Sequence, residues 1–335
     1  MPPNESSQTR AQEILCNIFD EPIERLQCHL DNVDTFGVQM NTCFRVALLV
    51  LLAAMAFGSA NRQSARILAS ETVAPEMPSN ESPNASNEPK ALSGNGDTVL
   101  LDAWYNSQQR KDAKGQQVYF HYKWNDETDS GYSLLGRIFN DDGAVTKTLF
   151  TAPTFKELRK AQVYIIVSPD IPVKNPNPHY MQPEEAKQIV QWVRAGGVLM
   201  IMENDPPNAD LEHLNLLSDR FGIHFNNVVR NQVKDDQFET GKLAIAGGGP
   251  IFHDGHTIFM KDICTITANS PAHAVFVDRG DTIMAVAKFG KGIVFATVDP
   301  WLYNEYTDGH KLPAAYDNYA AGKELVRWIL QQVRH

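Results

Sequence analysis

Four carboxylate side chains each follow a short apolar segment of the chain, at the point where that segment ends. They are Asp102, Asp170, Glu203 and Asp299. Paired carboxylates can donate and remove protons, which is the chemistry that cleaves glycosidic bonds. Carboxylate oxygens that cluster can equally hold a calcium ion. We therefore take these four residues as the catalytic candidates. Calcium is the one cofactor that their chemistry admits, and no other metal or cofactor is expected.

Aromatic and amide side chains lie close to these carboxylates in the sequence. Aromatic rings can stack on the faces of sugar rings, and amides hydrogen-bond hydroxyl groups in fixed directions. This combination favours an oligosaccharide as the ligand. The residues expected to contact it are Tyr105, Asn106, His121, Trp124, Asn204, Trp301 and Asn304. For each single residue, the alternative is a structural role in capping a helix or joining two loops.

The segments that carry these residues alternate between strand-like and helix-like patterns. Strands are expected at 98–104, 144–150, 163–170 and 197–205, with two more joined by a Gly-Lys-Gly hairpin at 290–292. Helices are expected from Ser130 as N-cap, at 154–161, from Pro183, at 210–222 and at about 318–333. This alternation predicts an α/β fold with a doubly wound, mostly parallel sheet and a β-rich insertion near 223–280. Ligands bind at the carboxyl ends of the strands in such sheets, so the polar residues should meet at one edge.

The segment 40–60 has the pattern of a secretory signal peptide. Arg45 precedes an unbroken apolar run over 46–57, and small residues follow at 58–60. A transmembrane helix needs about 20 apolar residues, so a permanent membrane anchor through 46–60 is the alternative. The prediction is a periplasmic or secreted protein, or one anchored with its folded domain outside the cytoplasm.

The remaining boundaries follow from composition. Residues 1–39 hold two basic and seven acidic residues, which does not suit a basic signal n-region. We therefore expect translation to start at Met40, with a short acidic cytoplasmic tail as the alternative. Residues 61–97 are rich in Ser, Asn, Pro and Glu and predict a flexible linker. The folded domain is expected over 98–333.

Charge and motif content narrow the classes of function. The formal net charge is −10, and this disfavours nucleic acid as a partner, because a nucleic-acid-binding protein normally presents a basic face. Only Cys264 lies beyond the expected signal segment, which leaves no intramolecular disulfide in the folded domain.

Four segments of the chain resemble the class I glutamine amidotransferase-like superfamily. They are VYIIVSPD, VQWVRAGGVLMIMEND, the Gly-Lys-Gly hairpin and VDPWLYNEY. They look most like domains that are fused to, or encoded beside, unsaturated rhamnogalacturonyl hydrolases in polysaccharide-degrading bacteria. The resemblance covers about 98–333. It implies a flavodoxin-like or glutamine amidotransferase-like fold, a link to carbohydrate metabolism and a glycoside hydrolase as functional partner.

One departure from that superfamily bears on activity. Its active members carry a nucleophilic cysteine in a G-x-C-x-G elbow after a central strand. Here the strand VLMIM runs into Glu203-Asn204-Asp205, and neither G-x-C-x-G nor G-x-S-x-G occurs in the chain. A cysteine-dependent glutaminase and a serine-elbow hydrolase are therefore not expected.

These observations lead to three hypotheses. The first is an exported carbohydrate-associated domain that binds an oligosaccharide derived from a plant polysaccharide at the carboxyl ends of its strands. The second is a glycan hydrolase that uses two of the four carboxylates as acid and base. The third is a tethered protein-interaction module without catalysis. If the domain is an enzyme, we expect it to be a carbohydrate-active hydrolase.

Overall fold

The computed structural model describes residues 96–333 of the chain. The predicted extension, the signal segment and the linker up to residue 95 lie outside these described residues. Within the described range, no helix has the length and apolarity that would let it cross a membrane. The predicted anchor at 46–60 therefore stays a prediction.

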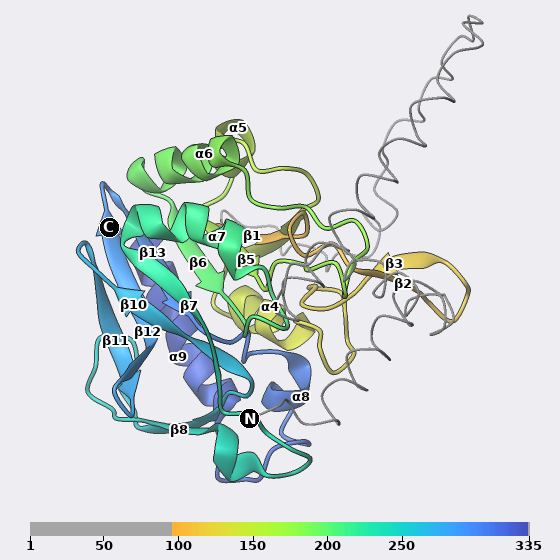
Figure 1. Cartoon of the computed structure of the whole chain (residues 1–335), viewed down its shortest axis with the longest axis vertical. Helices are drawn as coiled ribbons and strands as arrows, with labels where there is room; N and C mark the ends of the chain where they lie inside the picture. The colour runs from red at the N-terminus through yellow and green to blue at the C-terminus, as the bar shows by residue number, and fades with distance from the viewer. Residues whose placement is uncertain (1–95, 334–335) are drawn as a thin grey trace, which may run out of the picture. The chain divides into compact units, whose positions relative to one another are not determined.

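One large sheet of nine strands organises the fold (Figure 1). Five of its strands pair in parallel, and β5 and β6 are buried at every residue. Such strands are covered on both faces, which explains their continuous apolar sequences VYIIV and VLMIM. The predicted α/β fold class is confirmed. In order across the sheet the parallel strands are β4 (Val145–Leu149), β1 (Thr98–Asp102), β5 (Val163–Val167), β6 (Val198–Met202) and β13 (Gly292–Thr297).

The other half of the sheet is antiparallel and comes largely from the region expected to be a β-rich insertion. Its strands continue the main sheet beyond β13 rather than forming a separate layer. Two short hairpins, β2–β3 and β8–β9, stand apart from the main sheet. The antiparallel strands are β12 (Asp281–Phe289), β10 (Ile263–Ala268), β7 (Ile223–Arg230) and β11 (Ala272–Asp278). The hairpin strands are β2 (Gln109–Lys111), β3 (Gln117–Tyr119), β8 (Lys242–Ile245) and β9 (His256–Phe259).

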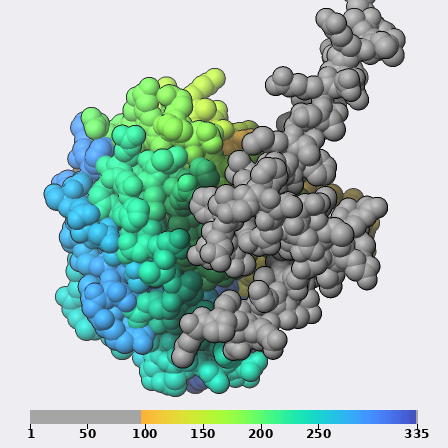
Figure 2. Space-filling model, viewed as in Figure 1, coloured from red at the N-terminus to blue at the C-terminus, as the bar shows by residue number. Residues whose placement is uncertain are grey.

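The helices pack in two groups, as a doubly wound sheet requires. One group is a series of neighbours, α5, α6 and α7, and the second is α4, α8 and α9. Figure 2 shows the green surface of α6 and α7 beside the blue surface of the antiparallel strands. The helices are α4 (Ser133–Asp141), α5 (Phe155–Leu158), α6 (Pro183–Arg194), α7 (Leu211–Ser218), α8 (Asn304–Thr307) and α9 (Asn318–Val333).

The start of α4 differs from the expectation. The helix begins at Ser133, and Ser130 lies in the loop before it, where its carbonyl accepts the Tyr122 backbone N–H. The loop turns tightly at Gly131, where a Cβ would lie 1.7 Å from the Asp126 carbonyl oxygen. These tertiary contacts hold residues 130–132 out of the helix, although the local pattern would extend it.

The register of the parallel strands shows that three central strands end side by side. Val167 of β5 and Thr297 of β13 are both register partners of Met202 in β6. The residues that follow these strands therefore emerge at one edge of the sheet, as expected from the sequence.

Candidate functional site

Asp102 ends β1 and is bonded inside the protein. Its side chain is 1% exposed. One oxygen accepts the Tyr105 backbone N–H at 2.8 Å, and the other accepts the Tyr164 hydroxyl at 2.7 Å. Burial raises the pKa of Asp102 to about 6, although the Tyr164 and Tyr105 hydrogen bonds oppose that rise. The carboxylate thus shapes the loop after β1.

Asp170 plays a similar role in the loop after β5. It is 0% exposed. It accepts the Ser107 backbone N–H at 2.8 Å, the Gln108 side-chain amide at 2.7 Å and the Asn175 side-chain amide at 2.7 Å. Both carboxylate oxygens are engaged, so Asp170 joins the loops that follow β1 and β5.

Two of the expected sugar contacts belong to the same buried network. The Tyr105 hydroxyl donates to Glu185 of α6 at 2.8 Å. Asn106 donates to the Ser168 carbonyl at 2.9 Å and accepts from the Lys123 amine at 2.8 Å. Both are 0% exposed. Burial lowers the pKa of Lys123 to about 8. In this structure these side chains pack in the interior.

Glu203 and Asp299 differ from the first two carboxylates. Each is fully buried, and each has one oxygen without a hydrogen-bond partner in the described part of the chain. The other oxygen accepts a single backbone N–H, from Asn204 at 3.0 Å and from Lys261 at 3.1 Å. Burial raises the pKa of both carboxyl groups well above the usual range. A buried polar atom without a partner is uncommon in native proteins and often marks a functional site.

Tyr122 lies in the electrostatic field of these two carboxyl groups. Burial raises its pKa, the charges of Asp299 and Glu203 add to that rise, and the side chains of Ser168 and Asn204 oppose it. Asn204 itself is half-buried and accepts the Asp205 backbone N–H at 2.9 Å. The residues that follow β5, β6 and β13 therefore form one polar cluster with Tyr122. We name it the strand-end cluster, and its members are Tyr122, Ser168, Glu203, Asn204 and Asp299.

Backbone strain also gathers at this edge. His121, Tyr122 and Ser168 have φ angles of 59°, 51° and 39°, in the left-handed region that residues other than glycine rarely adopt. Such strain is common at functional sites. Burial lowers the pKa of His121 to about 4, and its Nδ1 atom has no hydrogen-bond partner among the described residues.

Lys174 is a residue that the sequence analysis missed. It lies in the loop after β5, and no hydrogen bond or ion pair engages its amine within residues 96–333. Burial lowers its pKa, and Asp205, Asp170 and Glu203 oppose that change. The loop Ile171–Tyr180 is rich in Asn and Pro, which gave no signal that it would bring a cation to the strand ends.

Trp301, one of the expected sugar contacts, packs in the core. Trp301 is 0% exposed, and its indole N–H has no partner in the described region.

Within residues 96–333, no group of three or more His, Cys, Asp or Glu side chains is arranged to hold a metal ion.

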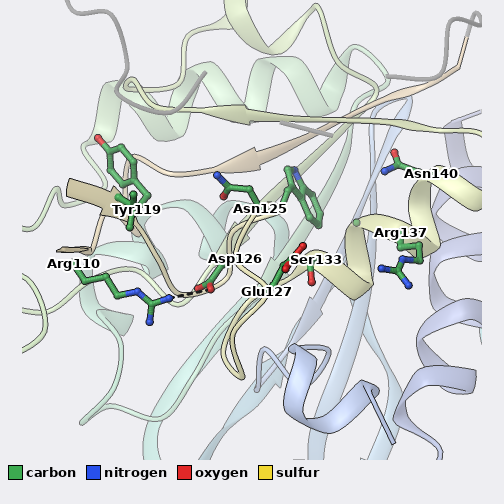
Figure 3. A pocket seen from close by; sticks show the side chains of 11 residues that line it. Arg110, Tyr119, Asn125, Asp126, Glu127, Ser133, Arg137 and Asn140 are labelled. Carbon is green, nitrogen blue, oxygen red and sulfur yellow. Dashed lines mark hydrogen bonds and ion pairs between the residues drawn. The ribbon is translucent and has the colours of Figure 1, made fainter. Parts of the chain in front are cut away.

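A groove opens beside this edge, between the β2–β3 hairpin and α4. Its volume is about 640 Å³. Figure 3 shows the side chains that line it, which come from the hairpin, from the loop 124–127 and from one side of α4. Trp124 is the expected sugar contact that reaches it. Most of the Trp124 ring is buried against α4, and its N–H donates to the Lys147 carbonyl at 3.0 Å. The other lining residues are Arg110, Val118, Tyr119, Asn125, Asp126, Glu127, Ser133, Gly136, Arg137 and Asn140.

Asn304 holds the wall of this groove in place. Its side-chain amide donates to the carbonyls of Asp126 at 3.0 Å and Thr128 at 2.8 Å. Its carbonyl oxygen accepts the Ser133 hydroxyl at 3.3 Å and the Leu134 backbone N–H at 3.1 Å. All its polar atoms are therefore used within the protein, between the loop and the start of α4.

The hairpin and α4 residues of the groove were not singled out in the sequence. Arg110 and Tyr119 lie on β2 and β3, and Arg137 lies on the exposed side of α4. The one signal at 109–119 is the Lys-Gly turn between polar residues, with Val118 as the single β-branched residue. A short polar hairpin has no apolar pattern, so the sequence did not predict these two strands.

Comparison with known proteins supports the fold and nothing finer. No family model and no curated protein matches the sequence. The N-terminal domain of mmIFT52 is similar in structure, with a TM-score of 0.51 and 17% identity over 69% of this chain and 96% of that chain. The cytoplasmic protein STM3548 from Salmonella typhimurium has a TM-score of 0.40 and 13% identity over 70% of this chain and 98% of that chain.

Glycoside hydrolases also occur among the structural neighbours. The exo-β-1,4-mannosidase Op5Man5 from Opitutaceae bacterium strain TAV5 has a TM-score of 0.36 and 14% identity, over 61% of this chain and 31% of that chain. This chain thus spans less than a third of that protein. The likeness to the mmIFT52 domain shows a Rossmann-like α/β fold. The resemblance to the glutamine amidotransferase-like superfamily is supported only as far as that fold.

Proposed function

We propose that this chain is an exported, carbohydrate-associated α/β domain that binds an oligosaccharide in the groove between the β2–β3 hairpin and α4. The observation that carries the proposal is the groove itself, whose volume of about 640 Å³ is in the usual range for ligand sites. Tyr119 supplies a half-buried ring, held against Phe150 with ring centres 4.9 Å apart. Asn125 and Asn140 add amide groups to the groove lining.

The proposal moves the ligand from the strand ends to the neighbouring groove. Asp102, Asp170, Tyr105 and Asn106 are buried and bonded to other parts of the protein, so a sugar would have to displace those bonds. The groove is open and needs no such rearrangement. Binding without cleavage is therefore the function that the geometry favours.

The wider setting is part of the same proposal. We place the domain in the class I glutamine amidotransferase-like superfamily, in the branch linked to unsaturated rhamnogalacturonyl hydrolases. The signal at 40–60 would direct it to the periplasm or the exterior, cleaved or retained as an anchor, and a glycoside hydrolase would be its functional partner.

One observation favours the hydrolase alternative. Glu203 and Asp299 each keep a carboxyl oxygen without a partner in the described residues, and raised pKa values suit a general acid. Cleavage would require the strand-end cluster to open, because both side chains are buried.

The experiment is calorimetric titration of the purified chain with neutral and acidic plant oligosaccharides, with mass spectrometry of each mixture after incubation. We expect heat of binding without new products. Tyr119→Ala should weaken binding about fivefold through loss of stacking. Its matched control is Tyr319→Ala, a half-buried tyrosine on α9 outside the groove. Cleavage products would favour the hydrolase, and no binding to any glycan would leave the interaction module.

A further inference from the structure

Two arginines line the groove of a chain whose net charge is −10. Arg137 lies on the exposed side of α4, and no hydrogen bond or ion pair engages it within residues 96–333. Arg110 stacks over the Phe120 ring at 5.0 Å. Its guanidinium reaches Asp126 and Thr128 only at 3.4 Å each, so most of its donors are available to a ligand.

The acidic residues of the groove offset only part of this charge, because Asp126 pairs with Arg110 at 3.4 Å and no ion pair engages Arg137 within residues 96–333. Asp126 is buried, and its oxygens accept the His121 backbone N–H at 3.0 Å and the Thr128 hydroxyl at 2.6 Å. The charge of Asp126 is offset mainly by its ion pair with Arg110. Glu127 is the exposed acid of the groove lining. Arg137 and the remaining N–H donors of Arg110 thus face Glu127 as the exposed anionic group of the lining.

Asn140 adds neutral hydrogen-bond donors to the groove. The Asn140 oxygen accepts the Thr146 hydroxyl at 3.4 Å, which leaves the amide N–H groups of Asn140 to a ligand. The Ser133 hydroxyl donates to Asn304, so it offers a ligand no donor. Figure 3 shows Arg110 and Arg137 toward opposite ends of the groove, with Glu127 between them in this view.

We infer that the groove selects an acidic oligosaccharide, one whose carboxylate or sulfate groups lie on at least two of its sugars. The guanidinium groups of Arg110 and Arg137 bind one oxyanion each, because a guanidinium matches the paired oxygens of such groups. Tyr119 stacks on the sugar ring that lies between the two oxyanions. The inference rests on the proposed function, since it names the ligand class of the same groove.

The experiment compares three trisaccharides by calorimetric titration of the purified chain at low salt. They are trigalacturonate, its fully methyl-esterified form and a sulfated neutral trisaccharide. The methyl ester keeps the sugar and removes the charge. We expect trigalacturonate or the sulfated sugar to bind at least about tenfold more tightly than the ester, and the tighter of the two identifies the oxyanion.

Three variants locate the selectivity. Arg137→Gln and Arg110→Gln should each weaken binding of the acidic sugar about five- to tenfold and leave the methyl ester unaffected. Glu127→Gln should strengthen it. Arg159→Gln is the matched control, since Arg159 is exposed on the chain just after α5 and does not line the groove. Thermal unfolding of each variant checks that the fold is intact.

The outcomes separate the two levels of the proposal. Equal binding of trigalacturonate and its methyl ester, with no effect of either arginine, overturns the acidic selectivity and leaves oligosaccharide binding in place. Failure of all three sugars to bind overturns the proposed function and this inference together. Weakening by Arg159→Gln equal to that of Arg137→Gln overturns the assignment to the groove.

Discussion

The groove and the strand-end cluster draw on the same loop, 121–131, but they differ in how far their polar groups are bonded and exposed. The groove takes Trp124, Asp126 and Glu127 from that loop. It also holds the exposed guanidinium of Arg137, which no hydrogen bond or ion pair engages within residues 96–333. The strand-end cluster takes Tyr122, and its carboxyl groups are buried. A site that is exposed can bind a ligand directly, whereas a buried one must first open.

This difference qualifies a general rule for α/β sheets. The rule that ligands bind at the carboxyl ends of the strands correctly indicates where polar residues gather. It does not indicate which of them remain accessible. Asp170 is bonded by both oxygens, while Glu203 has one oxygen without a partner in the described residues, although both follow central strands. The loops that cover each strand end account for the difference.

Asp170→Ala is expected to have the largest effect, and it tests the difference between the buried strand ends and the open groove. The substitution removes the acceptor of the buried Gln108 amide and of the half-buried Ser107 N–H, and it leaves the Asn175 amide with only the Ser107 hydroxyl. We expect the free energy of unfolding to fall by about 3 kcal/mol, as measured by urea denaturation. Groove binding by the folded protein should be unchanged. Loss of binding with little loss of stability would instead make Asp170 a ligand contact.

The next effect is that of Asn304→Ala, which acts on the groove through the loop. It removes the bonds from Asn304 to the Asp126 and Thr128 carbonyls and to the start of α4. We expect about 2 kcal/mol of lost stability and about tenfold weaker binding of the groove ligand by calorimetry. Asp170→Ala is the matched control, because it destabilises the fold without touching the groove wall. Equal binding by both variants would show that Asn304 does not position the groove.

The smallest effect is that of Glu203→Gln, and its size depends on pH. Because burial raises the pKa of Glu203 above its ordinary value of 4.5, the folded protein holds this proton more tightly than the unfolded chain. The unfolding free energy should therefore decrease as pH rises above about 4.5. Glu203→Gln removes that loss, so it should stabilise the protein at pH 8 by about 1 kcal/mol and change little at pH 4.

The control for this variant is Glu212→Gln, an exposed glutamate on α7, which should leave the pH dependence unaltered. A second readout separates the two sites. If Glu203→Gln abolishes a measured glycan cleavage, the strand-end cluster is the active site and the comparison drawn above is reversed.

The secondary structure was largely predictable because it follows from local patterns. The final helix occupies Asn318–Val333 as expected from its apolar face, and Pro183 is the first residue of α6. The prediction that α4 starts at Ser130 was wrong, because the turn at Gly131 depends on contact with Asp126. The β2–β3 hairpin was missed because a short polar hairpin has no apolar alternation to detect.

The candidate site was predictable in its residue types and not in its contacts. Asn304 was expected to bind the ligand, yet its amide is committed to the Asp126 carbonyl, 178 positions away in the chain. Lys174 and Arg137 gave no local sign of their position. A hydrogen bond between distant segments leaves no periodic trace in either of them.

The sequence by itself determined the α/β class, the main strands and the collection of polar residues at one edge of the sheet. Those features depend on the order of apolar and polar residues along short segments. The tertiary structure alone decided which polar groups face solvent, because the exposure of a side chain depends on every segment that packs over it. For that reason the open groove and the closed strand-end cluster became distinct only when the loops were in place.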